Sequence, residues 1–303
     1  MELSQHVLIV GGTGFIGEEL VPFLVKKGHK VSVFVRSSTQ DDWVKKQGGK
    51  AVYQLTIDES NPYDAIINLA GVTISSPVWT KKRKNLFWNS RLETTKNIVR
   101  AIQMAKKKPH VFLSASGISI YNDHPTEIFT EDSPTPPQKG YFLQNLCLAW
   151  EQAAFAAQDL GTRVVALRIA PVLGPGGLLQ TLRKTFGLGF GVYYGQGHQW
   201  VSWIQRTDLV RAIVFLLENP KTTGAYNLAS PHPVTQKELV ENLGTVLGKS
   251  CSISIPQSLV KLFLGEMGKN LLMISQRVYP QRLLAAGFNF LLPEIKSAIQ
   301  ASV

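Results

Sequence analysis

Short, almost wholly apolar runs alternate with longer segments of helical period through the first half of the chain. Uninterrupted apolar runs of this length are typical of strands that are covered on both faces, as in a parallel sheet. They predict strands at residues 6–10, 30–35, 51–54, 65–69, 111–115 and 163–169. The helical period predicts helices at residues 14–27, 91–107 and 142–157. Alternating strands and helices indicate βαβ units and a doubly wound parallel sheet, which is an α/β fold.

The pattern changes after about residue 170. Gly and Pro concentrate in PVLGPGG and GLGFGVYYGQG, and shorter periodic segments follow at residues 206–217, 225–228, 235–247 and 256–264. We therefore expect one domain over residues 1–170 and a smaller mixed α/β C-terminal lobe over residues 171–303. The first part of this lobe is expected to add a strand to the main sheet, so that the two regions are partly intertwined.

The turn after the first strand is a glycine loop, GGTGFIG, and a helix follows it directly. Gly11 permits a tight turn, Gly14 lets the backbone approach a pyrophosphate, and Gly17 lets helix and strand pack closely. Free N–H groups and the positive end of the helix dipole attract phosphate. This context predicts a Rossmann dinucleotide site whose loop residues are Gly11, Thr13, Gly14, Phe15, Ile16 and Gly17.

The end of the second strand selects the nucleotide. An NAD site places a carboxylate there to bond the ribose 2′-OH, whereas this chain has Arg36 and Ser37. A guanidinium binds the oxygens of a 2′-phosphate with two parallel hydrogen bonds. We therefore predict NADP(H) as the cofactor, with Arg36 and Ser37 at the phosphate; the alternative is that Arg36 is an ordinary surface residue.

The composition argues against several classes of protein. Of 303 residues, 44% are apolar and 17% charged, which is ordinary for a protein with a full core. No apolar run reaches the roughly 18 residues of a membrane helix, and the N-terminus resembles no secretory signal. The two cysteines, Cys147 and Cys251, are too few for a disulfide framework and lack metal-ligand spacing. We expect a cytoplasmic protein without a membrane or metal site.

The net charge of +11 comes largely from short basic runs at residues 45–46, 81–84 and 106–108. Such runs can attract nucleic acid or an anionic membrane, or they can be solvated helix ends and loops. For nucleic acid the only indication is charge, because an RNA-binding motif and interleaved aromatic residues are missing. We expect a small-molecule partner instead.

Together, these motifs resemble the short-chain dehydrogenase/reductase superfamily in its extended, epimerase-like branch. NLAG (residues 68–71) is similar to the element that lines the adenine and ribose, and SRLETT (residues 90–95) to the helix beneath the cofactor. SAS (residues 114–116) is similar to the stretch that carries the active-site hydroxyl. GHQWVSWIQRTDL and the tail PQRLLAAGFNFLLPEIKSAI resemble a sugar-nucleotide-epimerase-like subgroup of uncharacterised substrate.

The resemblance covers essentially the whole chain. It implies an NADP-dependent oxidoreductase or epimerase whose C-terminal lobe closes over the cofactor, and a homodimer formed through the helices that cover the sheet. Residues 168–175 resemble the segment at the nicotinamide end. The resemblance thus adds to the cofactor-binding set Leu69, Ala70, Gly71, Arg91, Ala170 and Pro171.

The superfamily's catalytic dyad is missing. It consists of a Tyr and a Lys four residues later, and none of the eight tyrosines here has a lysine at that spacing. Alignment on Trp150 and Glu151 puts Leu143 and Cys147 at the dyad positions. Losing a positioned proton donor typically costs about 10²–10⁴-fold in rate. The missing dyad therefore argues against carbonyl reduction by the superfamily's usual mechanism.

Three residues are candidate catalytic substitutes: Ser116 at the strand end, where it would orient a carbonyl, Tyr121 in the following loop, and Tyr141 just before a helix. Each also has a structural explanation, since a strand-end Ser bonds nearby backbone and a Tyr can simply be packed. Among other residues, a small buried hydrophobe is expected at Cys147 and a pairing or capping role within its helix at Glu151. Candidate substrate contacts are His198, Trp200 and Arg206, while Trp203 is expected in the core.

Two functions stay open. One is an NADP-dependent oxidoreductase or epimerase that acts on a small anionic or sugar-like substrate, which the aromatic and basic residues of the C-terminal lobe favour. The other is a catalytically weak or inactive NADP(H)-binding sensor or scaffold, which the missing dyad favours.

Overall fold

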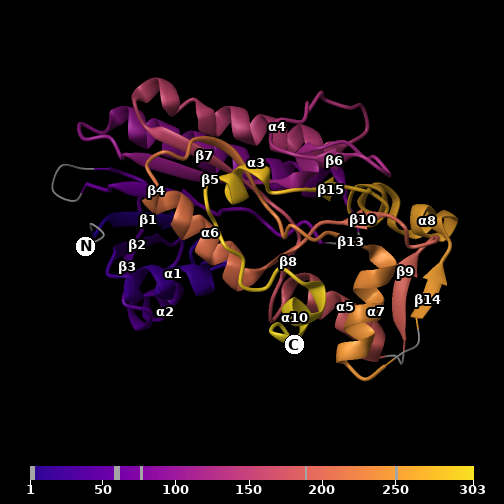
Figure 1. Cartoon of the computed structure of the whole chain (residues 1–303). Coiled ribbons are helices and arrows are strands. Elements are labelled where there is room, and N and C mark those ends of the chain that lie inside the picture. Colours follow the sequence, from indigo (N-terminus) through magenta and orange to yellow (C-terminus); the bar gives the residue numbers. More distant parts are fainter. Residues whose placement is uncertain (1–3, 58–61, 76–77, 188–189, 250–251) are drawn as a thin grey trace.

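One seven-stranded parallel sheet organises the molecule (Figure 1). The computed structural model describes residues 4–57, 62–75, 78–187, 190–249 and 252–303. The strand order is β12-β7-β5-β4-β1-β2-β3. The chain adds β2 and β3 on one side of β1 and then β4, β5, β7 and β12 on the other, so the order of addition reverses between β1 and β4, as in a Rossmann sheet. The strands are β1 (His6–Val10), β2 (Lys30–Phe34), β3 (Lys50–Val52), β4 (Ala65–Asn68), β5 (Val111–Gly117), β7 (Arg163–Ile169) and β12 (Gly224–Leu228).

Helices cover both faces of this sheet. Successive side chains of a strand point to opposite faces, so an apolar strand such as β1 contributes to a core on each side. Val7 and Ile9 of β1 pack in one core with α1 (Gly17–Lys26) and α6 (Arg206–Glu218). Leu8 and Val10 pack in the other core with α3 (Lys81–Met104) and α4 (Phe142–Phe155). The apolar strands predicted from the sequence are thus buried on both sides, except the edge strand β3, where Lys50 is exposed and Ala51 and Val52 are half-buried. The helix α2 (Asp41–Lys46) and the 3₁₀ turns η1 (Ser38–Gln40), η2 (Ile118–Ile120) and η3 (Gln158–Leu160) lie in the connections.

The second half of the chain both completes the sheet and builds a smaller lobe. β12 pairs in parallel with β7, so the expected extra strand is present. The lobe has its own core, which includes Leu173, Phe186 and the fully buried Trp203. Its elements are β8 (Val172–Leu173), α5 (Gly177–Gly187), β9 (Gly191–Tyr194), β10 (Trp200–Val201), β11 (Ile204–Gln205), β13 (Val234–Thr235), α7 (Gln236–Val246), β14 (Ser252–Ile255), α8 (Gln257–Met267), the π-helix η4 (Gly268–Leu272) and α10 (Ile295–Gln300). Beside the sheet lie β6 (Ile128–Phe129), β15 (Arg277–Val278) and α9 (Gln281–Ala285).

Most predicted elements occur, but α3 begins ten residues before the predicted start at residue 91. Its first turns are a run of polar and basic residues around the buried Phe87, so the helical period is hidden there. Thr80 caps the helix, since its Oγ1 accepts a hydrogen bond from the Arg83 amide at 3.2 Å. Within the described residues, α3 is the longest helix, and no helix is apolar and long enough to cross a bilayer.

The basic runs lie at helix ends. Lys108 Nζ donates to the carbonyl oxygens of Gln103 (2.8 Å) and Ala105 (2.6 Å), which satisfies acceptors at the C-terminus of α3. Lys84, near the opposite end of the same helix, pairs with Glu266 at 2.8 Å. These two lysines thus have protein partners near the two ends of α3, which agrees with the interpretation of the basic runs as helix ends.

Candidate functional site

The glycine loop after β1 is shaped by two close backbone approaches. Gly11 has a φ of +85°, and a Cβ there would lie 2.8 Å from the Leu69 carbonyl carbon. A Cβ on Gly17 would lie 2.3 Å from the carbonyl oxygen of Gly12. Ile16 is the N-cap of α1, and its side chain makes no capping hydrogen bond. The main-chain N–H groups at the start of α1 are the groups that would meet a phosphate, and this assignment stays a prediction.

The residues beyond β2 lie near this loop. Gln40 Nε2 donates to Thr13 Oγ1 at 2.8 Å, which ties the segment after β2 to the glycine loop. Arg36 and Ser37 are exposed, and Arg36 forms no ion pair with any residue that the structure describes. Ser37 Oγ accepts a hydrogen bond from the Thr39 amide at 3.3 Å. The guanidinium of Arg36 is thus available to a ligand phosphate.

Phe15 joins two motifs that are far apart in sequence. The guanidinium of Arg206, at the start of α6, lies 4.8 Å from the centre of the Phe15 ring, and its Nη1 donates to the Phe15 carbonyl at 3.2 Å. Arg206 also pairs with Glu19 of α1 at 2.7 Å. A Cβ on Gly174 would lie 3.0 Å from the Phe15 ring, so PVLGPGG also packs on this residue. Arg206, expected at a substrate, instead fixes the glycine loop.

A cleft of about 250 Å³ opens where β5 and β7 end, and we call it the Ser116 cleft. It brings together four residues of the predicted site, Arg91, Ser116, Ala170 and Pro171. The remaining lining is mostly apolar and consists of Ile74, Gly117, Ile118, Ser119, Leu143, Leu146, Cys147, Trp150, Ile169 and Leu271. Carboxyl ends of parallel strands are where ligands bind in open α/β sheets. Both residues that stand at the missing dyad's positions, Leu143 and Cys147, face this cleft.

Arg91 supplies the positive charge of the Ser116 cleft. Its guanidinium lies 5.4 Å from the centre of the Trp150 ring and donates to the carbonyl oxygens of Phe87 (3.2 Å) and Val72 (3.1 Å). Burial lowers its pKa. No carboxylate in the described part of the chain pairs with it. A Cβ on Gly71 would lie 2.9 Å from the Arg91 Cζ, so the predicted Leu69–Ala70–Gly71 segment runs against this side chain.

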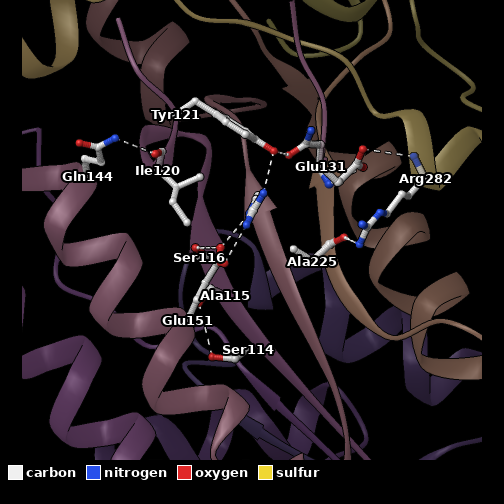
Figure 2. Close-up of polar contacts among 12 residues, drawn as sticks. Ser114, Ala115, Ser116, Ile120, Tyr121, Glu131, Gln144, Glu151, Ala225 and Arg282 are labelled. Carbon is white, nitrogen blue, oxygen red and sulfur yellow. Dashed lines mark hydrogen bonds and ion pairs between the residues drawn. The ribbon is translucent and has the colours of Figure 1, made fainter. Parts of the chain in front are cut away.

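Ser116 begins a buried hydrogen-bond network behind the cleft (Figure 2). Its Oγ donates to Glu151 Oε1 of α4 at 2.8 Å. Arg168 of β7 donates to the same carboxylate twice, from Nε to Oε1 at 2.9 Å and from Nη2 to Oε2 at 3.0 Å. Arg168 Nη1 also donates to Tyr121 Oη at 2.9 Å, and Tyr121 in turn donates to Asn227 Oδ1 at 2.7 Å. Burial lowers the pKa of Arg168, but the hydrogen bonds and charge of Glu151 raise it above its ordinary value.

This network corrects the expectation for Glu151. The carboxylate pairs with Arg168 across the helix–sheet interface and not within α4. The sequence offered no signal for it, because the two residues lie 17 positions apart on different elements. Only the packing of α4 on β5 and β7 brings Ser116, Glu151 and Arg168 together.

Neither candidate tyrosine lines the Ser116 cleft. Tyr121 is 1% exposed, and its hydroxyl is engaged by Arg168 and Asn227. Burial raises the pKa of Tyr121 to about 12. Tyr141 is the N-cap of α4, where its hydroxyl donates to Asp123 at 3.3 Å. The geometry therefore supports Ser116, and not these tyrosines, as the polar group that meets a ligand.

Other candidates lie outside the cleft. Trp200 stacks with Arg277, whose Cζ is 4.4 Å from its ring centre, and His198 is exposed in a separate depression beside Ser275. Trp203 lies in the core of the lobe, as expected. Cys251 lies outside the described residues.

Cys147 is predicted to react slowly with alkylating reagents. Burial raises its thiol pKa to about 12, so at pH 8 the thiolate fraction should be on the order of 10³-fold below that of an ordinary cysteine. Site-resolved mass spectrometry after iodoacetamide treatment would measure this rate, with the urea-unfolded protein as control. Equal alkylation of Cys147 in the folded and unfolded protein would contradict its burial.

Known proteins resemble this chain over nearly its full length. The profile of the NAD dependent epimerase/dehydratase family matches residues 7–229, and that of a domain of unknown function, DUF1731, matches residues 255–302. The human epimerase family protein SDR39U1 is 34% identical over 303 residues, covering 99% of this chain and 100% of the human protein. Epimerase family protein SH2119 of Staphylococcus haemolyticus (strain JCSC1435) is 33% identical over 297 residues, covering 98% of each.

A solved structure agrees with the fold. The crystal structure of human SDR39U1 (isoform 2) with NADPH superimposes with a TM-score of 0.86 at 32% identity, covering 97% of this chain and 98% of that chain. The resemblance predicted from the motifs is therefore confirmed, together with the α/β Rossmann fold. This chain belongs to the NAD dependent epimerase/dehydratase family and carries a DUF1731 region at its C-terminal end.

Proposed function

We propose that this protein is an NADP(H)-dependent oxidoreductase or epimerase that acts on a small molecule bound in the Ser116 cleft. The observation that carries this proposal is that the cleft and the open glycine loop both lie at the carboxyl ends of the parallel strands, on either side of the point where the strand order reverses. The NADPH in the structure of human SDR39U1 supports the choice of cofactor.

The chain's own residues fit this cofactor along its length. Gly11, Gly14 and Gly17 would hold the pyrophosphate at the start of α1, and Arg36 would meet the 2′-phosphate. The nicotinamide end would lie beside Ala170 and Pro171, which line the cleft. When bound, the nicotinamide supplies hydride transfer. The protein supplies position, electrostatics and exclusion of water.

The cleft limits the proton chemistry. Leu143 has no titratable group, and the thiol of Cys147 keeps its proton at neutral pH because its pKa is about 12. Ser116, the half-buried Ser119 and bound water are therefore the groups that can exchange a proton with a substrate oxygen. Arg91, a cation without a carboxylate partner among the described residues, favours a substrate with negative charge or many oxygen atoms.

A second candidate function is an NADP(H)-binding sensor or scaffold with weak or no catalysis. It is favoured by the apolar side chains at the dyad positions. A cytoplasmic location, a homodimer and the lack of a nucleic-acid partner stay predictions under both functions.

Charge reversal at Arg36 tests the cofactor assignment. We expect Arg36→Glu to weaken NADPH binding at least tenfold and to leave NADH binding within about twofold, because loss of a charge-assisted hydrogen bond alone is worth about 1.5–3 kcal/mol. Calorimetric titration of both nucleotides measures the effect. Arg100→Glu, on the exposed side of α3, is the matched control and should bind as the wild type does.

Two outcomes of this titration would count against the proposal. Wild-type protein that binds NADH as tightly as NADPH would overturn the NADP(H) assignment. Wild-type protein that binds neither nucleotide would overturn both candidate functions.

A further inference from the structure

Helix α8 has two apolar faces, and only one of them is packed on the protein. The inner face carries the buried residues Val260 and Met267. The outer face carries Leu259, which is 42% exposed, and Leu262 and Phe263, which are each 73% exposed. Their spacing of three and four residues places these three side chains next to one another along the helix. We call these three residues the α8 ridge.

The α8 ridge is unusual for a surface. Single apolar side chains are common on protein surfaces, whereas a contiguous exposed group of large ones marks an interaction site. The helix lies at the outer edge of the smaller lobe, on the opposite side of the molecule from α2 in Figure 1. Within the residues that the structure describes, the chain leaves the ridge exposed, so a partner from outside the chain is needed to bury it.

The surroundings of the ridge are basic. Between residues 252 and 278 the chain has three cations, Lys261, Lys269 and Arg277, and one carboxylate, Glu266. Glu266 is already neutralised by Lys84 of α3, whose Nζ lies 2.8 Å from its Oε2. Lys261 and Lys269 are exposed and form no ion pair in the described part of the chain. Apolar side chains bordered by lysines are typical of a helix that lies on an anionic membrane surface.

The start of α3 extends this basic surface. The ion pair between Lys84 and Glu266 ties the first turns of α3 to the end of α8. Residues 81–84 read KKRK, and the sequence has no acidic residue between positions 78 and 91. Lys81 and Lys82 are exposed. The partner that covers the ridge therefore meets an excess of positive charge, which favours an anionic partner.

Two other occupants fit the ridge less well. A second copy of this chain would bring another net charge of +11 toward a basic surface, so repulsion opposes self-association. A stable protein–protein interface takes about 20–30 residues from each partner, whereas the ridge consists of side chains that project from one helix of 11 residues. A bilayer needs no matching pocket, because projecting apolar side chains enter the boundary between headgroups and acyl chains.

We propose that the α8 ridge binds this protein to the surface of an anionic lipid membrane. Leu259, Leu262 and Phe263 enter the acyl boundary, and the nearby lysines contact the headgroups. The attachment is peripheral, because a helix on the surface needs one apolar face and not the roughly 20 apolar residues of a spanning helix. It differs from the sequence-based expectation, which included no membrane.

The place of α8 in the fold gives this attachment a consequence. The π-helix η4 follows α8 directly, and Leu271 of η4 lines the Ser116 cleft. Binding through the ridge therefore keeps the Ser116 cleft close to the lipid. The inference itself rests on α8 and its charges, and not on the function proposed for that cleft.

Vesicle flotation of the full chain tests the proposal. One set of vesicles contains phosphatidylcholine alone, and the other contains phosphatidylcholine and phosphatidylglycerol in equal amounts. We expect the wild type to partition onto the anionic vesicles at least about tenfold more strongly than onto the neutral ones. Most of this binding should disappear in about 1 M salt, where the Debye length is about 3 Å.

Apolar substitutions test the ridge. Leu262→Ser with Phe263→Ser should lower the partition coefficient onto anionic vesicles at least about tenfold, because two large side chains no longer leave water. The matched control is Met104→Ser with Leu291→Ser, since these side chains are 85% and 61% exposed and lie outside α8. It should bind as the wild type does.

Charge reversals test the lysines. Lys261→Glu should lower the partition coefficient onto anionic vesicles at least about threefold, because attraction to the headgroups becomes repulsion. Lys45→Glu, at an exposed position of α2, is the matched control and should leave binding unchanged. All these side chains are exposed, so the thermal denaturation of each variant should match that of the wild type.

The proposal is overturned if the wild type binds neither kind of vesicle, or if it binds neutral and anionic vesicles equally. It is also overturned if Leu262→Ser with Phe263→Ser binds anionic vesicles as tightly as the wild type does, since charge alone would then explain the binding. Light scattering identifies a second copy as the occupant if the wild type is a dimer that binds no vesicles and the same variant is a monomer.

Discussion

Glu151→Leu is expected to lower the free energy of unfolding by about 3–5 kcal/mol, because it leaves a buried guanidinium without its counter-charge. Arg168 is 7% exposed and directs two hydrogen bonds at the Glu151 carboxylate. A leucine accepts neither, and burial prevents water from replacing them. Ser116 also loses its acceptor. Urea denaturation followed by circular dichroism measures the change.

Removing both charges should recover most of this loss. Replacing a buried ion pair by apolar residues of similar volume is often neutral, so Glu151→Leu with Arg168→Met should be clearly more stable than Glu151→Leu alone. Glu93→Leu is the matched control, since Glu93 pairs with Lys96 while its side chain is 50% exposed, and it should cost less than about 1 kcal/mol. A single Glu151→Leu variant that is as stable as this control would show that the network contributes little to folding.

Gly17→Ala is expected to damage folding and nucleotide binding together. The added Cβ would lie 2.3 Å from the Gly12 carbonyl oxygen, so backbone must shift where β1 meets α1. Overpacking of this kind costs about 1–3 kcal/mol. Displacement of the amides at the start of α1 should weaken NADPH binding at least about tenfold. Thermal denaturation and calorimetric titration measure the two effects.

Substitutions at two other glycines separate the effect on folding from the effect on NADPH binding. Gly187→Ala meets no atom within 4 Å and should behave as the wild type does. Gly14→Ala meets only the Gly11 carbonyl oxygen, at 3.3 Å. It should lose NADPH binding with a smaller loss of stability, because the second glycine of such a loop lets the backbone approach the pyrophosphate. Wild-type NADPH affinity in Gly17→Ala would show that the loop does not bind the phosphates.

Local patterns in the sequence were enough to predict most of the sheet. Strands buried on both faces are apolar throughout, and glycine is needed wherever backbone approaches backbone, as at Gly11 and Gly17. Both signals depend on near neighbours in the chain, and so β1, the glycine loop and α1 lie as predicted. The early start of α3 was missed because its first turns cover little core and therefore carry no apolar period.

The sequence by itself thus determined the family and the parallel sheet, and it predicted where a dinucleotide would bind. Only the tertiary structure decided which polar groups act together. Ser116, Glu151 and Arg168 come from three elements, and Arg206 reaches Phe15 from 191 residues away. Such pairs leave no periodic trace, because their contacts depend on how helices pack across the sheet. The same packing places Tyr121 behind the cleft and directs the proton of Ser116 away from it.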